Sequence, residues 1–549
     1  MYLLSFYNSQ IYNLCMTVPK LLILLTVMAF GEAGPCSGRP CNILVMLPMP
    51  AYSHTNNFMP IFRELAARGH NVTIVSPFPQ KKPTPNITDI VLPNLLDKLM
   101  AQSPVQNWAD DDNFFNKMFG LWMFASFGLI PVLETEELQN FIMETNLQFD
   151  LVITETWFVQ FPLIAFGHKY NAPVVAISPS ILFPIAAEFT GNDIPVSYAP
   201  LTMFAFNDRM SFLERAQNMF LYYWEIYSGK LYFLKQQDSI MRKYFKYPGS
   251  ENLPYISDML ENVSLTIVDH HYALGYPRPH HKNIVEFGGI NAHVPEKLPA
   301  DLQKIMDNAK DGIIYVSFGS YFSLSMLKPF IGDAIINALG KTKRKVLFKM
   351  DNDTILENYN YKNIEARKWF PQASILAHPN CKLFITHAGV HGLMEGLSHA
   401  VPFVAIPMMG DQKFNAKFIE TVGIGEVIDK DTITAEKLSN AINAVLTDSS
   451  YREKIKERSA IFKDQPMDIL DNVVYWIEYV IRHKGAPHLR PAVLDLYWYQ
   501  RLMLDVIAFY LLLIFLIVYI LVKIIRLFFN LITWMCCSKV SKNKKSKKE

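Results

Sequence analysis

The chain has 549 residues, of which 50% are hydrophobic and 19% are charged, and its formal net charge is +2 at pH 7. A chain of this length and hydrophobic content can bury more than one core, so we expect two or three domains. The nearly balanced charge argues against a nucleic acid as the main partner, because nucleic-acid-binding surfaces are usually strongly basic.

The N-terminus has the order of features of a secretory signal peptide. Pro19 and Lys20 precede the apolar run LLILLTVMAF, and a stretch of small residues from Gly31 to Gly34 follows it. Charged, apolar and small segments in this order are typical of a peptide that directs a protein into the secretory pathway. We therefore predict a signal peptide over residues 1–34.

The body of the chain alternates apolar strand candidates with helical or irregular spans. The strand candidates of the first half are NILVML, NVTIVSPF, LVITE and PVVAISPS, and those of the second half are IIYVSFGS, KVLFKM, LFITH, VPFVAIP and GEVI. This alternation is typical of parallel sheets covered by helices. We predict an α/β fold with two Rossmann-like domains, an N-terminal one over residues 35–285 and a C-terminal one over residues 286–490.

Two polar residues follow strand candidates of the first half. His54 comes after NILVML and a tight loop, at the start of a helix that runs to about Arg68, and Glu155 ends LVITE. Open α/β sheets place their ligand contacts at the carboxyl ends of strands, so both residues are candidates for a site. A lone histidine can also simply cap a helix, and position alone leaves the two interpretations open.

The segment from Trp369 to Gln412 holds the densest group of candidate ligand-binding residues. Trp369 and Gln372 flank a proline, and the strand LFIT leads to His387 and Gly389 at the start of a helix. Backbone N–H groups at a helix N-terminus carry partial positive charge and bind phosphate without a metal. The pattern predicts a site for a nucleotide diphosphate.

Further polar residues extend this predicted site. Glu395 falls two turns into the same helix, and Asp411 and Gln412 follow the apolar strand VPFVAIPM. Ser320 ends the segment SFGS after the first strand of the second half, where its hydroxyl and the N–H of Gly319 could meet the phosphates. An ordinary strand-to-helix turn would explain SFGS equally well on local grounds.

The segment from Trp369 to Gln412 resembles the donor-binding motif of the UDP-glycosyltransferase family. The resemblance implies a GT-B fold, in which two Rossmann-like domains face a cleft. It also implies that the chain is a hexosyltransferase that uses a UDP-sugar as donor. The implied donor contacts are Trp369 and Gln372 on the nucleoside, Glu395 on the ribose hydroxyls, His387 and Ser320 on the diphosphate, and Asp411 and Gln412 on the sugar.

The chain departs from the family pattern at two positions. Ala388 stands where the family usually has a glycine, and His391 stands where asparagine or a small residue is common. The methyl group of Ala388 could crowd the phosphate turn and weaken donor binding. We include both Gly389 and His391 in the predicted donor site.

The resemblance also gives roles to the two residues of the first half. It implies that His54 is the general base that takes the proton from the acceptor hydroxyl, and that Glu155 orients His54 where the family commonly has aspartate. An imidazole suits this role because its ordinary pKa of about 6.5 leaves it mostly neutral and still basic at neutral pH. A single direct displacement implies that an α-linked donor gives a β-glycoside.

The acceptor implied by the resemblance is a small lipophilic molecule with a hydroxyl group. Residues 107–146 and 181–246 are rich in Phe, Met, Trp and Tyr. Runs of this kind usually form helix cores, but in this family the corresponding region encloses the acceptor. The sequence is nearer the invertebrate members, which favours UDP-glucose over UDP-glucuronate, and it leaves a homo-oligomer open.

The C-terminal end carries a predicted membrane anchor. Val506 to Val522 are 17 uninterrupted apolar residues, about 25 Å as a helix, against a bilayer core of about 30 Å. Basic residues follow, which places the tail in the cytosol and the catalytic body in the lumen. We predict a transmembrane helix over residues 502–522 and a cytosolic basic tail over residues 523–549. The last five residues fit a K-x-K-x-x retrieval pattern, so we expect a single-pass type I protein of the endoplasmic reticulum.

Two alternatives remain open at this point. Asp351 and Asp353 form a D-x-D pattern after the strand candidate KVLFKM, and Asp110 to Asp112 form a second acidic triplet. A D-x-D pattern can hold Mn²⁺ on a diphosphate, so the first alternative is a metal-dependent glycosyltransferase. The second is a catalytically silent membrane protein that binds lipophilic molecules, and Ala388 is the feature that favours it. We expect no metal and no other cofactor.

Overall fold

The computed structural model describes most of the chain. The described residues are 40–93, 95, 122, 128–157, 160–292, 295–319, 324, 327–351, 353–359 and 361–545. The predicted signal peptide, the acidic triplet from Asp110 to Asp112, and Ser320 lie outside these residues. The chain divides into two compact units, Met1–Arg490 and Pro491–Glu549.

The first half of the large unit is built on a parallel sheet. Its strand order is β3-β2-β1-β4-β5-β6-β7, and every pair of neighbouring strands runs parallel. The strands are β1 (Asn42–Met46), β2 (Asn71–Ser76), β3 (Ile87–Val91), β4 (Leu151–Thr154), β5 (Val174–Ser178), β6 (Leu265–Val268) and β7 (Ile284–Glu286). The central strands β1, β4, β5 and β6 are almost entirely buried, as expected for a sheet covered on both faces.

Helices follow most of these strands. They are α2 (Tyr52–Ala67), α6 (Glu136–Met143), α7 (Ala165–Tyr170), α8 (Pro184–Thr190), α9 (Phe212–Ser228), α10 (Leu234–Tyr244) and α11 (Ile256–Leu260). A short π-helical segment, Gly229–Phe233, joins α9 to α10. Helix α9 begins with a complete capping box, in which the Ser211 hydroxyl accepts from the N–H of Glu214 and the Glu214 carboxylate accepts from the N–H of Ser211.

The second half repeats this architecture with a second parallel sheet, in the order β10-β9-β8-β11-β12-β13. The strands are β8 (Ile313–Ser317), β9 (Lys345–Lys349), β10 (Ile364–Arg367), β11 (Cys381–Thr386), β12 (Phe403–Ala405) and β13 (Gly425–Val427). The helices are α12 (Ala300–Asn308), α13 (Pro329–Lys341), α14 (Gln372–Ala377), α15 (Val390–Ser398), α16 (Gln412–Val422), α17 (Ala435–Thr447) and α18 (Ser449–Lys463).

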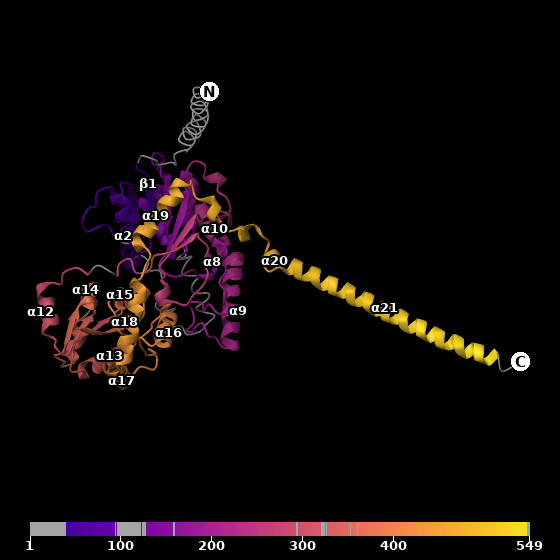
Figure 1. The fold of residues 1–549 in the computed structure, drawn as a ribbon. Helices are drawn as coiled ribbons and strands as arrows, with labels where there is room; N and C mark the ends of the chain where they lie inside the picture. The colour runs from indigo at the N-terminus through magenta and orange to yellow at the C-terminus, as the bar shows by residue number, and fades with distance from the viewer. Residues whose placement is uncertain are drawn as a thin grey trace, which may run out of the picture. The chain divides into compact units, whose positions relative to one another are not determined.

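Helix α19 (Ile469–Arg482) returns from the second half to the first. Its buried residues Val473 and Ile477 belong to the same hydrophobic core as Ile43 of β1 and Phe62 of α2. Figure 1 shows α19 beside α2 and β1, although these elements lie more than 400 residues apart in the sequence. The predicted C-terminal domain, residues 286–490, includes this helix, whose apolar face nevertheless packs in the first core.

The second unit consists of short helical turns followed by one long helix. Helix α20 covers Trp498–Arg501 and α21 covers Leu504–Lys545, so α21 continues well beyond the predicted end at residue 522. The part from Leu504 to Met535 contains an 18-residue window with a mean hydropathy of 2.8, and this window is not buried. By length and composition it can cross a membrane, in agreement with the predicted anchor.

The predicted α/β class with two Rossmann-like sheets is confirmed. All nine strand candidates of the sequence become strands, whereas β3, β6, β7 and β10 were not predicted. Strands β3 and β10 lie at sheet edges and are only half-buried, so they lack a continuous apolar run. Strands β6 and β7, with four and three residues, were also missed.

Candidate active site

The candidate site residues lie where the two halves of the large unit meet. In the first half they follow β1, β4 and β6, and in the second half they follow β8, β10, β11 and β12. Two contacts join the two sets: the rings of Tyr52 and Trp369 lie 6.2 Å apart, and Asp269 pairs with His391. The carboxyl ends of both sheets therefore contribute to one region, which is where open α/β sheets bind ligands.

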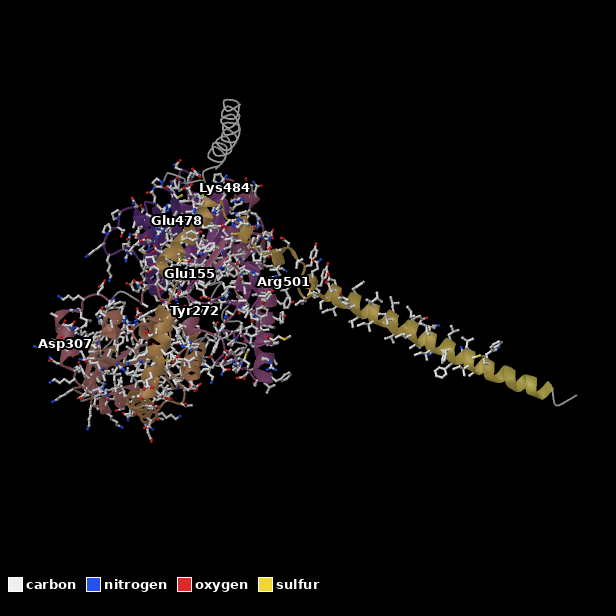
Figure 2. All side chains as sticks on the ribbon, viewed as in Figure 1. Glu155, Tyr272, Asp307, Glu478, Lys484 and Arg501 are labelled. Carbon is white, nitrogen blue, oxygen red and sulfur yellow. The ribbon has the colours of Figure 1, made fainter. Side chains whose placement is uncertain are left out.

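His54 and Glu155 come together from different strands of the first sheet. The Nδ1 atom of His54 lies 2.7 Å from Oε1 of Glu155, and the two side chains are 16% and 2% exposed. Gln160 donates a hydrogen bond of 2.9 Å from its amide to the other Glu155 oxygen, Oε2. Glu155 lies in the first half (Figure 2). This arrangement fixes a carboxylate on Nδ1 and leaves Nε2 of His54 as the nitrogen that can act on a ligand.

Gln160 was not predicted from the sequence. It follows Glu155 by five residues, is fully buried, and has no motif of its own. A buried amide beside a buried carboxylate is the only signal that identifies it, and that signal requires the fold.

The turn between β11 and α15 has the geometry of an anion site. Gly389 is the N-cap residue of α15 and no side chain caps the helix, so the first backbone N–H groups are available to a ligand. A Cβ atom added at Gly389 would lie 2.5 Å from Nε2 of His387, and one added at Gly319 would lie 2.9 Å from the same atom. Both glycines therefore make room for the His387 imidazole.

Ala388 adopts the left-handed backbone conformation, with a φ of 65°, in which a glycine would be favoured. Its side chain is fully buried in the hydrophobic core of the second half. The methyl group that the sequence analysis expected to crowd the phosphate turn is thus packed in the core.

His387 is held in its neutral form. Burial, together with the positive potential of His391 and Lys349, lowers the pKa of His387 to about 4. A neutral imidazole can donate one hydrogen bond to a phosphate oxygen but adds no net charge to the site.

Trp369 presents an aromatic face beside this turn. It follows β10 and is 60% exposed, which is unusual for a tryptophan. The ammonium group of Lys349 lies 5.4 Å from the centroid of the indole ring, and the same group donates a hydrogen bond to the carbonyl of Gly319. Burial lowers the pKa of Lys349. Lys349, which the sequence analysis missed, thereby links the aromatic residue to the glycine turn after β8.

Gln372 and Glu395 form a hydrogen-bonded chain with Tyr315. The Gln372 amide donates to Oε2 of Glu395 at 2.6 Å, and the Tyr315 hydroxyl donates to Oε1 of Gln372 at 3.2 Å. Burial raises the pKa of Glu395 to about 7, against the opposing effects of Gln372 and His391. The carboxyl group is therefore poised between its two protonation states at neutral pH.

Asp411 and Gln412 lie at the start of α16. Burial raises the pKa of Asp411, whose Oδ2 accepts from the Asn415 amide at 2.9 Å. The same amide donates to the carbonyl of Ala388 at 3.0 Å, so Asn415 joins the start of α16 to the phosphate turn. Gln412 accepts through Oε1 from the backbone of Met408 and Met409, which leaves its amide nitrogen as the group that could donate to a ligand.

His391, the residue that departs from the family pattern, lies in the first turn of α15. Its Nε2 atom is 2.7 Å from Oδ2 of Asp269, which follows β6 in the first half. Asp269 was not predicted from the sequence, because the two residues are 122 positions apart.

The residues of the metal-dependent alternative lie after β9. Asp351 is exposed, and Asp353 begins a short 3₁₀ helix, Asp353–Asn358. Within the described part of the chain, no group of three or more His, Cys, Asp and Glu side chains is arranged to hold a metal ion.

The aromatic-rich residues 181–246 divide between core and surface. Phe189 and Phe233 are buried in the first core, whereas Phe212 and Phe220 of α9 are exposed. Much of the second segment, residues 107–146, lies outside the described residues, so the expected acceptor pocket stays a prediction.

Comparisons with known proteins agree with this geometry. Residues 42–540 match the family described as UDP-glucoronosyl and UDP-glucosyl transferase. The chain is 33% identical over 532 residues to the UDP-glycosyltransferase UGT4 of Dactylopius coccus, which covers 94% of this chain and 100% of that protein. It is also 32% identical over 514 residues to the UDP-glucuronosyltransferase 1A9 of Homo sapiens, with 90% and 91% of the two chains covered.

Solved structures share the fold at low sequence identity. The UDP-glucose: anthocyanidin 3-O-glucosyltransferase in complex with UDP has a TM-score of 0.52 and 15% identity, covering 80% of this chain and 98% of that one. The glycosyltransferase VinC in complex with dTDP has a TM-score of 0.54 and 13% identity, covering 81% and 100%. The predicted GT-B fold is confirmed, and the match over residues 42–540 shows that the chain belongs to the UDP-glucuronosyl and UDP-glucosyl transferase family, whose members move a sugar from a UDP-sugar to an acceptor.

Proposed function

We propose that the chain transfers glucose from UDP-glucose to a hydroxyl group of a small lipophilic acceptor, with inversion at the anomeric carbon. The observation that carries the proposal is the buried His54–Glu155 pair, 2.7 Å apart, in the region where the first half meets the phosphate turn of the second. This arrangement supports a direct displacement, since it provides a base for the attacking hydroxyl and an anion site for the departing UDP.

In this mechanism His54 acts as the general base. Glu155 accepts a hydrogen bond from Nδ1–H, which keeps that proton on Nδ1, so the lone pair on Nε2 takes the proton of the acceptor hydroxyl as that oxygen bonds to the anomeric carbon. The charge that develops on the imidazole then lies beside the carboxylate. Gln160 keeps the carboxylate in place through its second oxygen.

The donor is held by the second half. Trp369 stacks on the uracil, Gln372 contacts the nucleoside, and Glu395 accepts from the ribose hydroxyls. The diphosphate binds the N-terminus of α15 beside His387 and Gly389. Asp411 and Gln412 bind hydroxyl groups of the sugar. Preorganised N–H donors of this kind stabilise the charge that develops on the leaving group, so the mechanism requires no metal.

Two observations support glucose over glucuronate. The sugar end of the site contains the buried carboxyl group of Asp411, beside which the carboxylate of a glucuronate would be unfavourable. In addition, a relative that is 32% identical over 497 residues is the UDP-glucosyltransferase 2 of Dactylopius coccus. Relatives named glucuronosyltransferases also match, so the donor has to be tested directly.

We place the catalytic body in the lumen of the endoplasmic reticulum, held there by α21. Lys523 and Arg526 lie near the middle of that helix, and basic residues continue to its end. Positive charge on this side supports a cytosolic tail. Attachment of a glycosylation sequon at either end of the full chain, followed by glycosidase treatment of microsomes, tests the orientation.

The decisive experiment measures transfer by the full chain in detergent or microsomes. UDP-glucose, UDP-glucuronate and UDP-galactose are each offered with a panel of phenols, steroids and aliphatic alcohols. We expect transfer from UDP-glucose. In His54→Ala the rate of transfer should fall at least about 100-fold, while UDP binding is retained. Turnover of His54→Ala within about threefold of the native chain would refute the base, and preferred use of UDP-glucuronate would refute the donor assignment.

A further inference from the structure

The first turn of α15 contains a histidine that is bound by a residue of the other half. His391 is the second residue of this helix, two positions after the N-cap Gly389. Its Nε2 atom lies 2.7 Å from Oδ2 of Asp269, whose side chain is only 1% exposed. A buried carboxylate in contact with an imidazole favours the charged form of that imidazole, because an unpaired buried charge costs several kcal/mol.

Asp269 is held in place from three directions. Its backbone N–H donates to Ser178 at the end of β5. Its Oδ2 atom also accepts from the Asn57 amide at 2.9 Å, and Asn57 in turn accepts from Asn291, in the connection between the two halves. Its other oxygen, Oδ1, is buried and has no hydrogen-bond partner among the described residues. Charge on Asp269 is therefore balanced chiefly by His391.

The charged groups around His391 belong to the donor site. Asp411 faces His391 from the start of α16, and Glu395 faces it from within α15. His387 faces it from the turn after β11. Burial lowers the pKa of His391, but Asp269, followed by Asp411 and Glu395, raises it above the ordinary value. His387 in the same turn is neutral, so the two imidazoles of the turn differ in charge.

We propose that Asp269 holds His391 as an imidazolium, and that this imidazolium is the positive end of an ion pair that lies beside the diphosphate of the donor at the phosphate turn. Nε2 lies against the Asp269 carboxylate in the ion pair, so Nδ1–H is the donor that remains for a ligand. Asp269 acts through His391 and is a positioning residue. The inference rests on the proposed function, because it assumes that α15 binds a UDP-sugar.

The pair also explains how the two halves can act together. Asn57 lies one turn after His54 on α2, so Asp269 is bonded to the helix that carries the base and to the helix that carries the phosphate turn. A diphosphate that binds the charged form of His391 stabilises that charged form. It therefore also stabilises the His391–Asp269 contact between the two halves.

The test measures UDP affinity of the full chain in detergent by calorimetry between pH 6 and pH 9. Asp269→Asn keeps the shape and an oxygen acceptor for Asn57 but removes the charge. We expect UDP binding to weaken about 10- to 100-fold at pH 7.5, the scale of one charge-assisted hydrogen bond. In the native chain affinity should fall as pH rises through the pKa of His391, and in Asp269→Asn this fall should move to lower pH. Glu395 titrates in both proteins, so the difference between their pH dependences of UDP affinity reports on His391.

His391→Gln provides the second arm, and it keeps the experiment decisive if Asp269→Asn folds poorly. His391→Gln should weaken UDP binding to a similar extent, and adding Asp269→Asn to it should cost little more, because the two residues act as one unit. The KM for the acceptor should not change in any of these variants.

Asp307→Asn is the matched control. Asp307 makes a similar contact, since its Oδ1 atom lies 3.1 Å from Nε2 of His378. Figure 2 shows Asp307 remote from Glu155. It should leave UDP affinity unchanged. Native UDP affinity and pH dependence in Asp269→Asn would overturn the inference, even if transfer by the native chain supports the proposed function. Failure of the native chain to bind UDP would overturn the proposed function and this inference with it.

Discussion

Replacing Glu155 by glutamine should slow transfer strongly without affecting the donor. The substitution keeps the length of the side chain and leaves an oxygen to accept from Gln160, but it removes the negative charge beside Nδ1 of His54. The charge centres of the imidazolium and the carboxylate lie about 4 Å apart, which at an effective dielectric constant of about 20 gives an attraction of about 4 kcal/mol. Since each 1.4 kcal/mol is a factor of ten, kcat should fall by up to about 1000-fold, and by less than in His54→Ala, which removes the base itself.

The substitution should also change the tautomer of His54, and this change should slow transfer as well. A glutamine can donate its amide N–H to Nδ1, which places the proton of the neutral imidazole on Nε2 and removes the lone pair that the mechanism requires. Steady-state kinetics with saturating acceptor gives kcat, and calorimetry with UDP gives the affinity for the nucleotide. We expect UDP affinity to stay within about twofold, because every donor contact belongs to the second half.

Asp150→Asn is a suitable control for Glu155→Gln. Asp150 precedes the same strand, β4, at its other end, where its Oδ2 accepts from the N–H of Asn42 at 2.9 Å. It undergoes the same change from acid to amide far from His54, and it should keep kcat nearly native. A Glu155→Gln enzyme with kcat within about threefold of the native value would refute the role of the pair.

The remaining predictions concern the donor side. Trp369→Ala should weaken UDP binding by about 1–3 kcal/mol through loss of a stacking face, whereas Tyr475→Ala, another exposed aromatic, should not; equal affinities in calorimetry would contradict the stacking. Glu395 has a pKa raised to about 7 in the folded chain, so the folded state binds more protons than the unfolded state above about pH 4.5, and stability falls as pH rises toward 7. Glu395→Gln should remove up to about 3 kcal/mol of this pH-dependent loss of folding stability. The variant should therefore have a higher Tm than the native chain at pH 8 but not at pH 5, and it should bind UDP more weakly. Transfer should survive excess EDTA, and loss on chelation with recovery on Mn²⁺ would favour a metal held by Asp351 and Asp353 instead.

The sequence alone was sufficient for the donor motif and for most of the sheets. Strands buried on both faces need continuous apolar runs, and these runs are visible in the sequence for the central strands. The residues from Trp369 to Gln412 belong to consecutive strand-to-helix turns, so local order along the chain already groups them. For the same reason Lys349, which follows a strand in the same half, could have been found from its position at the end of KVLFKM.

The tertiary structure decided the contacts between residues that are far apart in sequence. The pairing of His391 with Asp269, the support of Glu155 by Gln160 and the return of α19 to the first core depend on which surfaces meet, and no local periodicity specifies this.

Protonation states also depend on the fold. His387 and His391 are two histidines near one turn, and the sequence alone does not show that their protonation states differ. Burial and the positive charges of His391 and Lys349 keep the first neutral, and a buried carboxylate from the other half favours charge on the second. Ala388 is a related case, because its methyl group lies in the core only through a left-handed backbone that its residue type disfavours. Desolvation and the distance between charges are properties of the packed chain, so they can be assigned only once the packing is known.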